Sequence, residues 1–407
     1  MNNRTLTAGP NINRPFCNIS AGRGVLIIKM SKKWVFLALV LLAIAGCGKR
    51  EDPVKIVEID GVRHVQNPAV PIKGTIDLKL EKVREVNPYE IDDVGLRYYG
   101  SARSEDGELL LFDLNSGESH RFGPEGKHLG RMITEGQGPG EFPRFSGLRL
   151  HFIGNEIWAT SLVKIARFDR EGRFIEEVRN ESSIHPQILV DGDRYLGEKS
   201  EWTEKSQKRQ VVLVHFKIPG RGKDVVFYEA AKEWMVKKGS SAFSDEWATP
   251  LIHFAYCPLS KKVYTALNLE YKIMVKDLAG DTLYVIERPY EPIRLSAGDK
   301  EIMADWALKQ ESMRWMLDAY PDTLAALYDI CALPRGYLAA LRISGPKKIE
   351  VDVYDPEGRY VHILRLPEGM RLERHRFYSF GFSTLETRDE YPVYQEYRIK
   401  NLPAIFE

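Results

Sequence analysis

The chain of 407 residues is ordinary in composition, with 43% hydrophobic residues and 58 lysines and arginines against 57 aspartates and glutamates. A formal net charge of +1 lacks the clustered basic excess that nucleic-acid-binding proteins use, so we expect no nucleic-acid partner. The length is ample for a sizeable hydrophobic core.

The first 46 residues have the pattern of a processed leader. Residues 1–29 contain no acidic residue and precede a second methionine, Met30, so we interpret them as a mis-called gene start; a genuine extension is the alternative. Residues 30–46 begin Met-Ser-Lys-Lys and continue with an apolar run from Trp34 to Ile44. This pattern is typical of a signal peptide, and the run is too short for a membrane-spanning helix of about 20 residues.

The segment Ile44-Ala45-Gly46-Cys47 resembles the bacterial lipobox, in which the cysteine becomes the lipidated mature N-terminus. We therefore predict lipidation of Cys47 and a location in the bacterial cell envelope, on the outer membrane or facing the periplasm, with the membrane as a partner through the anchor. Residues 47–74 contain several prolines and are expected to form a tether, with a short strand over Val54–Ile59 as an alternative for part of it, and with the folded domain over residues 75–407.

The run Gly136-Gln137-Gly138-Pro139-Gly140-Glu141-Phe142-Pro143 opens the most regular part of the chain. Four short strands are predicted after it, ending at Val178 and joined by tight turns such as Arg170-Glu171-Gly172. A glycine at that turn can take the positive φ that a hairpin needs. Four antiparallel strands in about 45 residues match one blade of a β-propeller.

The segment made of the third strand, its turn and the fourth strand recurs along the chain. Its turn glycines are Gly126, Gly172, Gly220, Gly280 and Gly358, and the wider later spacings predict insertions at about residues 229–249 and 288–328. The second insertion has the pattern of a helix from Ser296 or Asp299 to about Ala319.

A sixth blade is implied at the end of the chain. The stretch Tyr394–Ile399 is predicted as its third strand, and the chain stops before a fourth. The alternating stretch Thr75–Val83 is expected to supply that strand, which would close the ring and remove exposed edges. The predicted fold is an all-β, six-bladed propeller closed by an N-terminal strand, with one helical insertion.

With these motifs in place, the chain resembles the bacterial six-bladed β-propeller lipoproteins related to NHL-repeat propellers, over roughly residues 75–400. The Gly-Gln-Gly-Pro-Gly-Glu-Phe run, the Phe-Asp-x-x-Gly turns and the lipoprotein signal carry the resemblance. Gly123 departs from it where the first turn has no aspartate, and so do the two long insertions. The resemblance implies a fold more firmly than a function.

Metal and disulfide chemistry stay open alternatives. The histidines His151, His185, His253 and His375 fall at or near predicted first strands. Their depths differ, whereas ligands of one ion lie within about 2.0–2.6 Å of it. A histidine pair with a carboxylate is the alternative to core histidines. Cys257 and Cys331 are either bridged, as a periplasm permits, or two free thiols. We predict no metal and no cofactor.

No nucleophile elbow, zinc-protease helix, Walker loop or dinucleotide fingerprint occurs in the sequence, so an enzyme is not favoured. The interpretation we favour is binding of a ligand or protein partner on one elaborated face; the alternatives are a metal-dependent propeller hydrolase or lyase and a structural subunit of an envelope complex. The glycine-rich loop either binds an anion or only shapes a crossover between blades. The predicted binding residues are Gly138, Gly140, Glu141, Arg144, Trp234, Trp247 and Arg314.

Overall fold

The chain divides into two compact units, Met1–Asp52 and Pro53–Glu407. The computed structural model describes residues 52–91, 94, 96, 99–113, 116–180, 184–191, 194–202, 207–215, 225–232, 236–238, 241–243, 247–304, 308, 311–368, 370, 376–377, 381–388 and 391–406. The expected gene start, signal peptide and lipidation site at Cys47 lie outside these residues.

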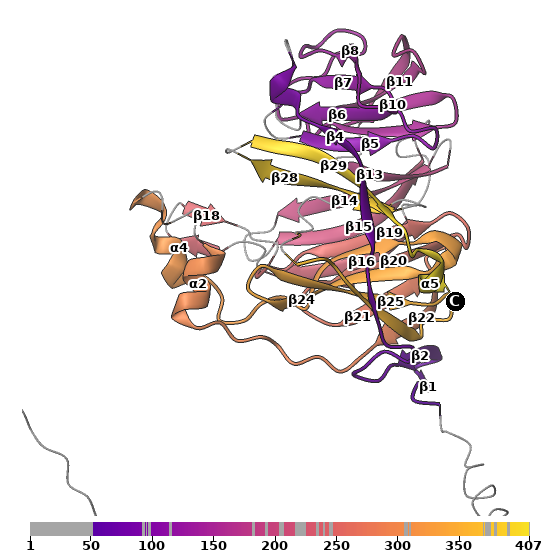
Figure 1. The fold of residues 1–407 in the computed structure, drawn as a ribbon, viewed down its shortest axis with the longest axis vertical. Coiled ribbons are helices and arrows are strands. Elements are labelled where there is room, and N and C mark those ends of the chain that lie inside the picture. The colour runs from indigo at the N-terminus through magenta and orange to yellow at the C-terminus, as the bar shows by residue number, and fades with distance from the viewer. Residues whose placement is uncertain are drawn as a thin grey trace, which may run out of the picture. The chain divides into compact units, whose positions relative to one another are not determined.

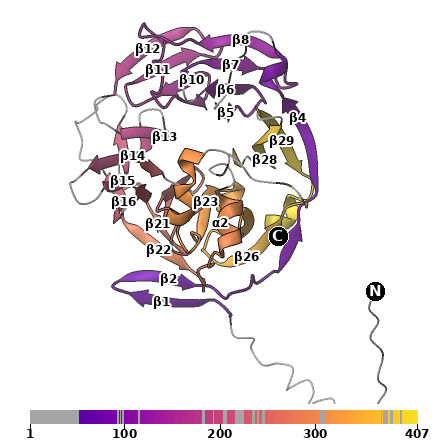
Figure 2. The same cartoon turned by 90° about the vertical axis from the view of Figure 1, so that its left-hand side faces the viewer.

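Six antiparallel sheets are arranged in a ring (Figures 1 and 2), and each is one propeller blade. Blades one to three consist of β5 (Tyr99–Arg103), β6 (Leu109–Asp113), β7 (Ser119–Phe122) and β8 (His128–Ile133); β9 (Arg149–Ile153), β10 (Glu156–Thr160), β11 (Lys164–Asp169) and β12 (Phe174–Arg179); and β13 (Ile184–Asp191), β14 (Arg194–Trp202), β15 (Gln207–His215) and β16 (Val225–Lys232).

Blades four to six follow the same order from the centre outward. They consist of β19 (Ile252–Cys257), β20 (Lys262–Leu267), β21 (Lys272–Lys276) and β22 (Thr282–Glu287); β23 (Leu327–Ala332), β24 (Leu338–Gly345), β25 (Lys348–Tyr354) and β26 (Tyr360–Arg365); and β27 (Arg376–Phe377), β28 (Gly381–Arg388), β29 (Tyr391–Ile399) and the N-terminal β4 (Leu80–Val86). The single-turn helices η1 (Pro88–Glu90), η3 (Pro334–Gly336) and α5 (Pro403–Phe406) lie in connections or at the C-terminus.

The hydrophobic core lies between blades. Each blade is a thin sheet whose two faces must both be covered, so its apolar side chains pack on its neighbours. Phe112 of blade one and Leu150 and Phe168 of blade two share one buried cluster. Leu196 of blade three packs in another with Val263 of blade four.

The predicted ring closure is confirmed, with a shift in the strand that closes it. β4 pairs antiparallel with β29, from Leu80 opposite Ile399 to Val86 opposite Tyr394. The first part of the predicted strand, β3 (Thr75–Asp77), instead pairs parallel with β26 of blade five. The alternating pattern is shared by two short strands because the chain crosses from one blade to the next between them, with Leu78 buried at the crossing.

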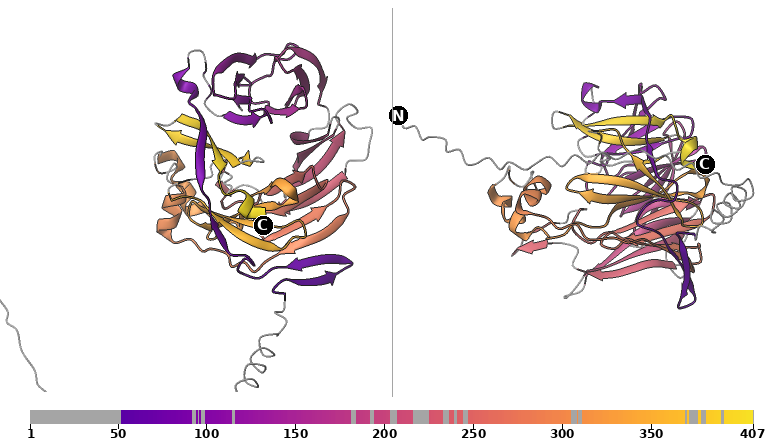
Figure 3. Two further views of the ribbon diagram at one scale, coloured as in Figure 1. Left: turned by 45° about the vertical axis from the view of Figure 1, so that its right-hand side comes forward. Right: turned by 60° about the horizontal axis from the view of Figure 1, so that its bottom comes forward.

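The expected tether is corrected over much of its length, and the alternative of a strand over Val54–Ile59 agrees with the structure. β1 (Lys55–Ile59) and β2 (Val62–Gln66) form a hairpin, and β2 pairs parallel with β22 of blade four. Asn67 then links blades four and five, since its amide donates to Glu287 O and Gly358 O while its side-chain oxygen accepts from Tyr360 N at 2.7 Å. Residues 55–86 thus pass along the outer edges of blades four, five and six (Figure 3).

A buried carboxylate in blade five also holds residues 55–86 in place, through a hydrogen-bonded arginine. Asp352, fully buried in blade five, accepts hydrogen bonds from the hydroxyl groups of Tyr271 and Tyr360 and from the Arg288 guanidinium at 2.5 Å. Arg288 also donates to the carbonyl oxygen of Ala69 at 2.9 Å. Burial beside this carboxylate raises the pKa of Tyr271, so the hydroxyl stays protonated and keeps donating.

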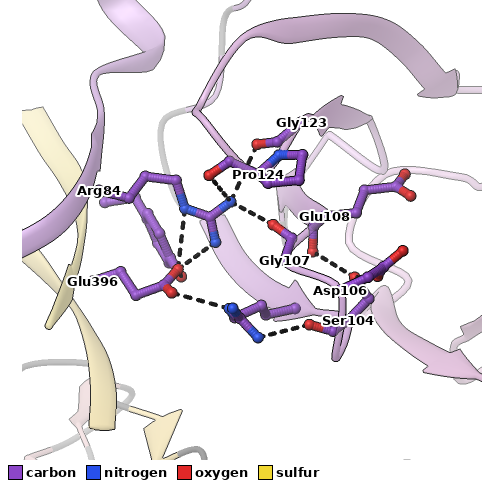
Figure 4. A network of polar contacts seen from close by, with 10 residues as sticks. Arg84, Ser104, Asp106, Gly107, Glu108, Gly123, Pro124 and Glu396 are labelled. Carbon is purple, nitrogen blue, oxygen red and sulfur yellow. Dashed lines mark hydrogen bonds and ion pairs between the residues drawn. The ribbon is translucent and has the colours of Figure 1, made fainter. Parts of the chain in front are cut away.

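A second buried network joins the two ends of the chain (Figure 4). The side chains of Arg84 on β4 and Glu396 on β29 are 3% and 4% exposed and form an ion pair. Arg103 of blade one donates to the other carboxylate oxygen at 3.0 Å. Arg84 Nη1 also donates to the carbonyl oxygens of Gly107 and Gly123. The closing strand is therefore bound to both blade six and blade one.

The repeated glycine turn is explained by the contact between blades. Gly126, Gly172, Gly280 and Gly358 have φ values of +84° to +93°, as predicted, whereas Gly220 lies outside the described residues. A Cβ at Gly172 would lie 2.8 Å from Met132 of the preceding blade, and one at Gly358 would lie 2.9 Å from Tyr284. Each of these turns therefore packs against the outer strand of the preceding blade. A residue with a side chain would be disfavoured there both by the positive φ and by the lack of space.

We expect Glu396→Ala to lower the free energy of unfolding by about 3–5 kcal/mol, because it leaves the buried Arg84 charge without its carboxylate. Arg398→Ala on the same strand removes a surface ion pair with Glu81 whose side chains are 58% and 43% exposed, and should change stability by about 0.5 kcal/mol or less. Equilibrium denaturation of the two variants measures the difference, and equal losses would contradict a structural role for the buried pair.

The turn contact predicts a second pair of variants. Gly358→Ala meets Tyr284 and Ile286, whereas Gly61→Ala, at a similar positive φ, has nothing within 4 Å. In both variants the free energy of unfolding should fall by about 1–2 kcal/mol, because alanine disfavours the left-handed backbone conformation. Only in Gly358→Ala should it fall by about 1–3 kcal/mol more, because the added methyl group overpacks the contact between blades. Indistinguishable denaturation midpoints for the two variants would rule out the inter-blade contact.

Candidate functional site

One face of the ring carries every connection from the fourth strand of a blade to the first strand of the next, and we call it the insertion face. Both predicted insertions arise there, between β16 and β19 and between β22 and β23. The first contains the hairpin β17 (Val236–Lys238) and β18 (Ser241–Phe243), and the second contains α2 (Ala297–Met303) and α4 (Trp315–Ala319). α4 contacts β17, and Figure 1 shows the two insertions together beyond one side of the ring.

The expected single helix from Ser296 to Ala319 is wrong in its length. Ser296 and Asp299 form a capping box at the start of α2, as the sequence indicates, but this helix ends at Met303, and Ala304 has left helical geometry. A short 3-10 turn (Glu311–Met313) precedes α4. The Lys300 ammonium donates to Tyr320 O at 2.9 Å, so the second half folds back on the first rather than extending it.

The ends of the two insertions are held together by buried backbone contacts. Ala325 N donates to Trp247 O at 2.7 Å, which joins the end of the second insertion to the end of the first. Asn268, fully buried in blade four, donates through its side chain to Thr249 O and accepts from Leu251 N. The insertions therefore rise from a fixed base on blades four and five.

The glycine-rich loop binds carboxylates of its own chain. Gly138 N donates to Glu141 Oε2 and Gly140 N donates to Glu177 Oε2, each at 2.9 Å. Phe142 is fully buried between blades one and two. The backbone donors that the anion-binding alternative would use are thus taken up internally. Gly138, Gly140 and Glu141, predicted as binding residues, shape the crossover, and this supports the structural alternative.

Arg144 and its neighbour Phe145 project from the same connection. The Arg144 side chain is 65% exposed and donates to Glu135 Oε2 at 2.7 Å. Phe145 is 74% exposed and has a φ of 55°, which is unusual for a bulky residue. Leu162 and Val163, each 44% exposed, lie beside it because Leu162 N donates to Ser146 O. We call Phe145, Leu162 and Val163 the apolar patch.

Sequence reasoning missed the apolar patch because apolar residues in short loops of a propeller resemble core residues. The remaining predicted residues are divided between two places. Trp247 is partly buried, with its ring 4.8 Å from that of Tyr328, and Arg314 is exposed at the start of α4. Both belong to the insertions over blades four and five, whereas Arg144 lies between blades one and two. Trp234 lies outside the described residues.

A mixed polar cluster brings together side chains from strands of blades three to five. His253 Nδ1 on β19 lies 3.4 Å from Asp329 Oδ1 on β23, and Arg209 on β15 lies 3.2 Å from Glu198 on β14. His253 also interacts electrostatically with Glu198, whose pKa is raised by burial against the opposing effects of Arg209 and His253. We call these four residues the His253 cluster.

The His253 cluster belongs to the insertion face by its position along the strands. His253 is the second residue of β19 and Asp329 the third of β23, and both strands begin at the ends of the insertions. The innermost strands surround the centre of the ring, as Figure 2 shows for β5, β13 and β23. The side chains of His253 and Asp329 are 13% and 34% exposed. The cluster is thus a half-buried polar site beneath the two insertions.

The other histidines are placed apart from this cluster. His185 Nε2 lies 2.8 Å from Gly147 O, and burial lowers the pKa of its imidazole. His151 lies on β9 of blade two, and His375 is outside the described residues. The described part of the chain contains no group of three or more histidine, cysteine or carboxylate side chains suited to a metal ion. Cys257 and Cys331 are not joined by a disulfide, so the bridged alternative is wrong.

Comparisons with known proteins bear on the fold. A family model described as 6-bladed beta-propeller matches residues 91–285. The chain is a six-bladed β-propeller. This confirms the fold that the resemblance implied, and the propeller's sixth blade is the one that the N-terminal strand completes. No curated protein sequence matches the chain.

Solved structures resemble the chain at low identity. A protein of Bacteroides fragilis shares 14% identity, with 83% of this chain and 99% of that chain covered and a TM-score of 0.47. A protein of Bacteroides vulgatus shares 11% identity over 86% and 100% of the two chains, with a TM-score of 0.41. Virginiamycin B lyase from Staphylococcus aureus shares 12% over 79% and 99%, with a TM-score of 0.40. Similarities this low carry no argument about activity. In the part of the chain that is described, no helix has the length and apolarity to span a membrane.

Proposed function

We propose that this propeller is an envelope lipoprotein, anchored through Cys47, that binds a partner on its insertion face. The observation that carries the proposal is the convergence of both insertions, which contact each other through α4 and β17, on the one face that also bears the apolar patch. Loops held by a rigid scaffold are where binding residues concentrate.

The apolar patch argues for a protein partner at this face. Exposed single apolar residues are normal, but Phe145 is held outward in a strained left-handed conformation next to two exposed aliphatic side chains. Arg144 and Arg314 are exposed cations on the same face, and arginines and aromatic residues are the side chains that most often anchor a protein interface.

The location in the cell envelope rests on the sequence. Lys32 and Lys33, the apolar run and the lipobox-like Cys47 support export and lipidation. Since one acyl chain binds a membrane only marginally, stable anchoring requires more than one lipid chain on the modified cysteine. The hairpin of β1 and β2 pairs with blade four, so the part of the expected tether from Lys55 to Gln66 belongs to the ring.

We expect Cys47→Ser to release the protein into the soluble fraction or to leave it with its leader uncleaved, because the lipid attachment point is removed. Cys17→Ser, within the expected mis-called start, is the matched control and should change nothing. Cell fractionation with intact-mass measurement checks this. A Cys47→Ser protein that stays membrane-bound at the mature mass would contradict lipid anchoring.

Site-specific photo-crosslinking tests the insertion face. A photoreactive phenylalanine analogue at position 145 should form a discrete protein adduct in cells, because the patch faces a partner. Leu259, equally exposed at 74%, lies in the turn between β19 and β20 on the opposite face and is the matched control position. Phe145→Ser should reduce the adduct formed from position 314 at an unchanged melting temperature. Adducts from position 259 without any from position 145 would place the interface on the face opposite the insertion face and contradict the proposal.

A further inference from the structure

The hairpin of β1 and β2 is the outermost part of blade four. β1 is the last strand of its six-stranded sheet, two strands beyond β22, and Figures 1 and 2 show it outside the ring. Ile56 and Ile59 on β1 are 54% and 44% exposed. Because they are three residues apart on one strand, their side chains point to opposite faces of the hairpin. A single surface covers both side chains only if it approaches along the outer edge of β1.

The segment that follows the hairpin is also apolar and exposed. Val70 and Ile72 are 70% and 42% exposed. Ile72 N donates to Tyr360 O at 3.0 Å, which places this segment beside the outer strand of blade five. We call residues 55–72 the outer rim. Large apolar side chains gathered along one edge mark a site of interaction with a protein or a membrane.

The charges of the outer rim balance one another. Its two basic residues, Lys55 and Arg63, and its two acidic residues, Glu58 and Asp60, are all exposed. A partner of strong net charge therefore gains little attraction from this edge. A zwitterionic lipid surface offers headgroup charges of both signs above an apolar layer, and it matches the combination of balanced charge and exposed apolar side chains.

The place of the outer rim in the chain brings it close to the proposed lipid anchor. Lys55 follows Cys47 by eight residues, and even a fully extended chain of that length spans at most about 29 Å. Of the strands that the structure describes, β1 is the first after Cys47. A lipid on this cysteine would therefore keep the outer rim near the bilayer surface.

We propose that the outer rim lies against the membrane that holds the Cys47 lipid, with Ile56 and Ile59 in the headgroup region. The inference rests on the proposed function, because it uses the Cys47 anchor. The insertion face lies at one end of the blade strands and the rim along their outer edge. Contact through the rim thus leaves the insertion face open to a partner.

The test uses the full lipidated protein in phosphatidylcholine vesicles with and without brominated acyl chains, which quench a fluorophore at membrane depth. A fluorescent amino acid is placed at position 56. The matched control position is Ile175, which is 45% exposed on β12, the outer strand of blade two. We expect position 56 to lose fluorescence in brominated vesicles and position 175 to keep it. Equal loss at the two positions, or no loss at position 56, would overturn the proposal.

Variants test whether the apolar side chains of β1 make the contact. With the fluorophore at position 72, the double variant Ile56→Ser, Ile59→Ser should reduce quenching at an unchanged melting temperature, because apolar surface is lost from an exposed edge. The control is Phe174→Ser, Ile175→Ser, at two exposed apolar residues of β12, and it should leave quenching unchanged. Equal quenching in the two double variants would overturn the proposal.

Failure of the anchor and failure of the rim contact give different results. If Cys47→Ser stays membrane-bound in cell fractionation, the anchor is wrong and the proposed rim contact falls with it. Vesicle binding of the lipidated protein without quenching at position 56 would refute the rim contact alone. A fluorescence change at position 56 that grows with protein concentration in the absence of lipid would assign the rim to a second copy of the chain and overturn the proposal.

Discussion

The ring depends on the ion pair between Arg84 and Glu396, because these residues come from opposite ends of the folded unit and complete the same blade. A propeller left open between its first and last blades would expose a strand edge and an apolar blade face to water. Burying two charges is costly, and here the cost is offset by further hydrogen bonds: Arg103 binds the second carboxylate oxygen and Arg84 reaches carbonyl groups of blade one. The closing strand of blade six is thereby bound to blade one as well.

The N-terminal segment extends this closure to half of the ring. Its strands pair with the outer strands of blades four, five and six, and the side chains of Asn67, Arg288 and Asp352 fix its path. Two of these blades, four and five, also begin where the two insertions end. A rigid base beneath long connections limits the conformational freedom that a ligand or partner would otherwise have to remove on binding.

The insertion face combines two kinds of surface. The apolar patch lies over the connection between blades one and two, while the His253 cluster joins strands of blades three, four and five near the ends of the insertions. The glycine-rich loop, which is the most distinctive motif in the sequence, belongs to neither surface. Its backbone donors bind Glu141 and Glu177, and Phe142 fills the core between two blades. The glycine-rich loop therefore has a structural role at the crossover between blades one and two.

The sequence by itself determined the blade count, the turn glycines and the fact that an N-terminal strand closes the ring, because these follow from local patterns: alternation along a strand, and a positive φ that glycine adopts without strain. Only the tertiary structure decided that residues 55–66 are strands rather than tether, since short parallel pairing with β22 leaves little periodic signal. It also decided that Glu198, Arg209, His253 and Asp329 meet. They lie on four strands of three blades, and the side chains that face one another across a blade interface are set by how the sheets twist and stack, which no spacing along the chain encodes.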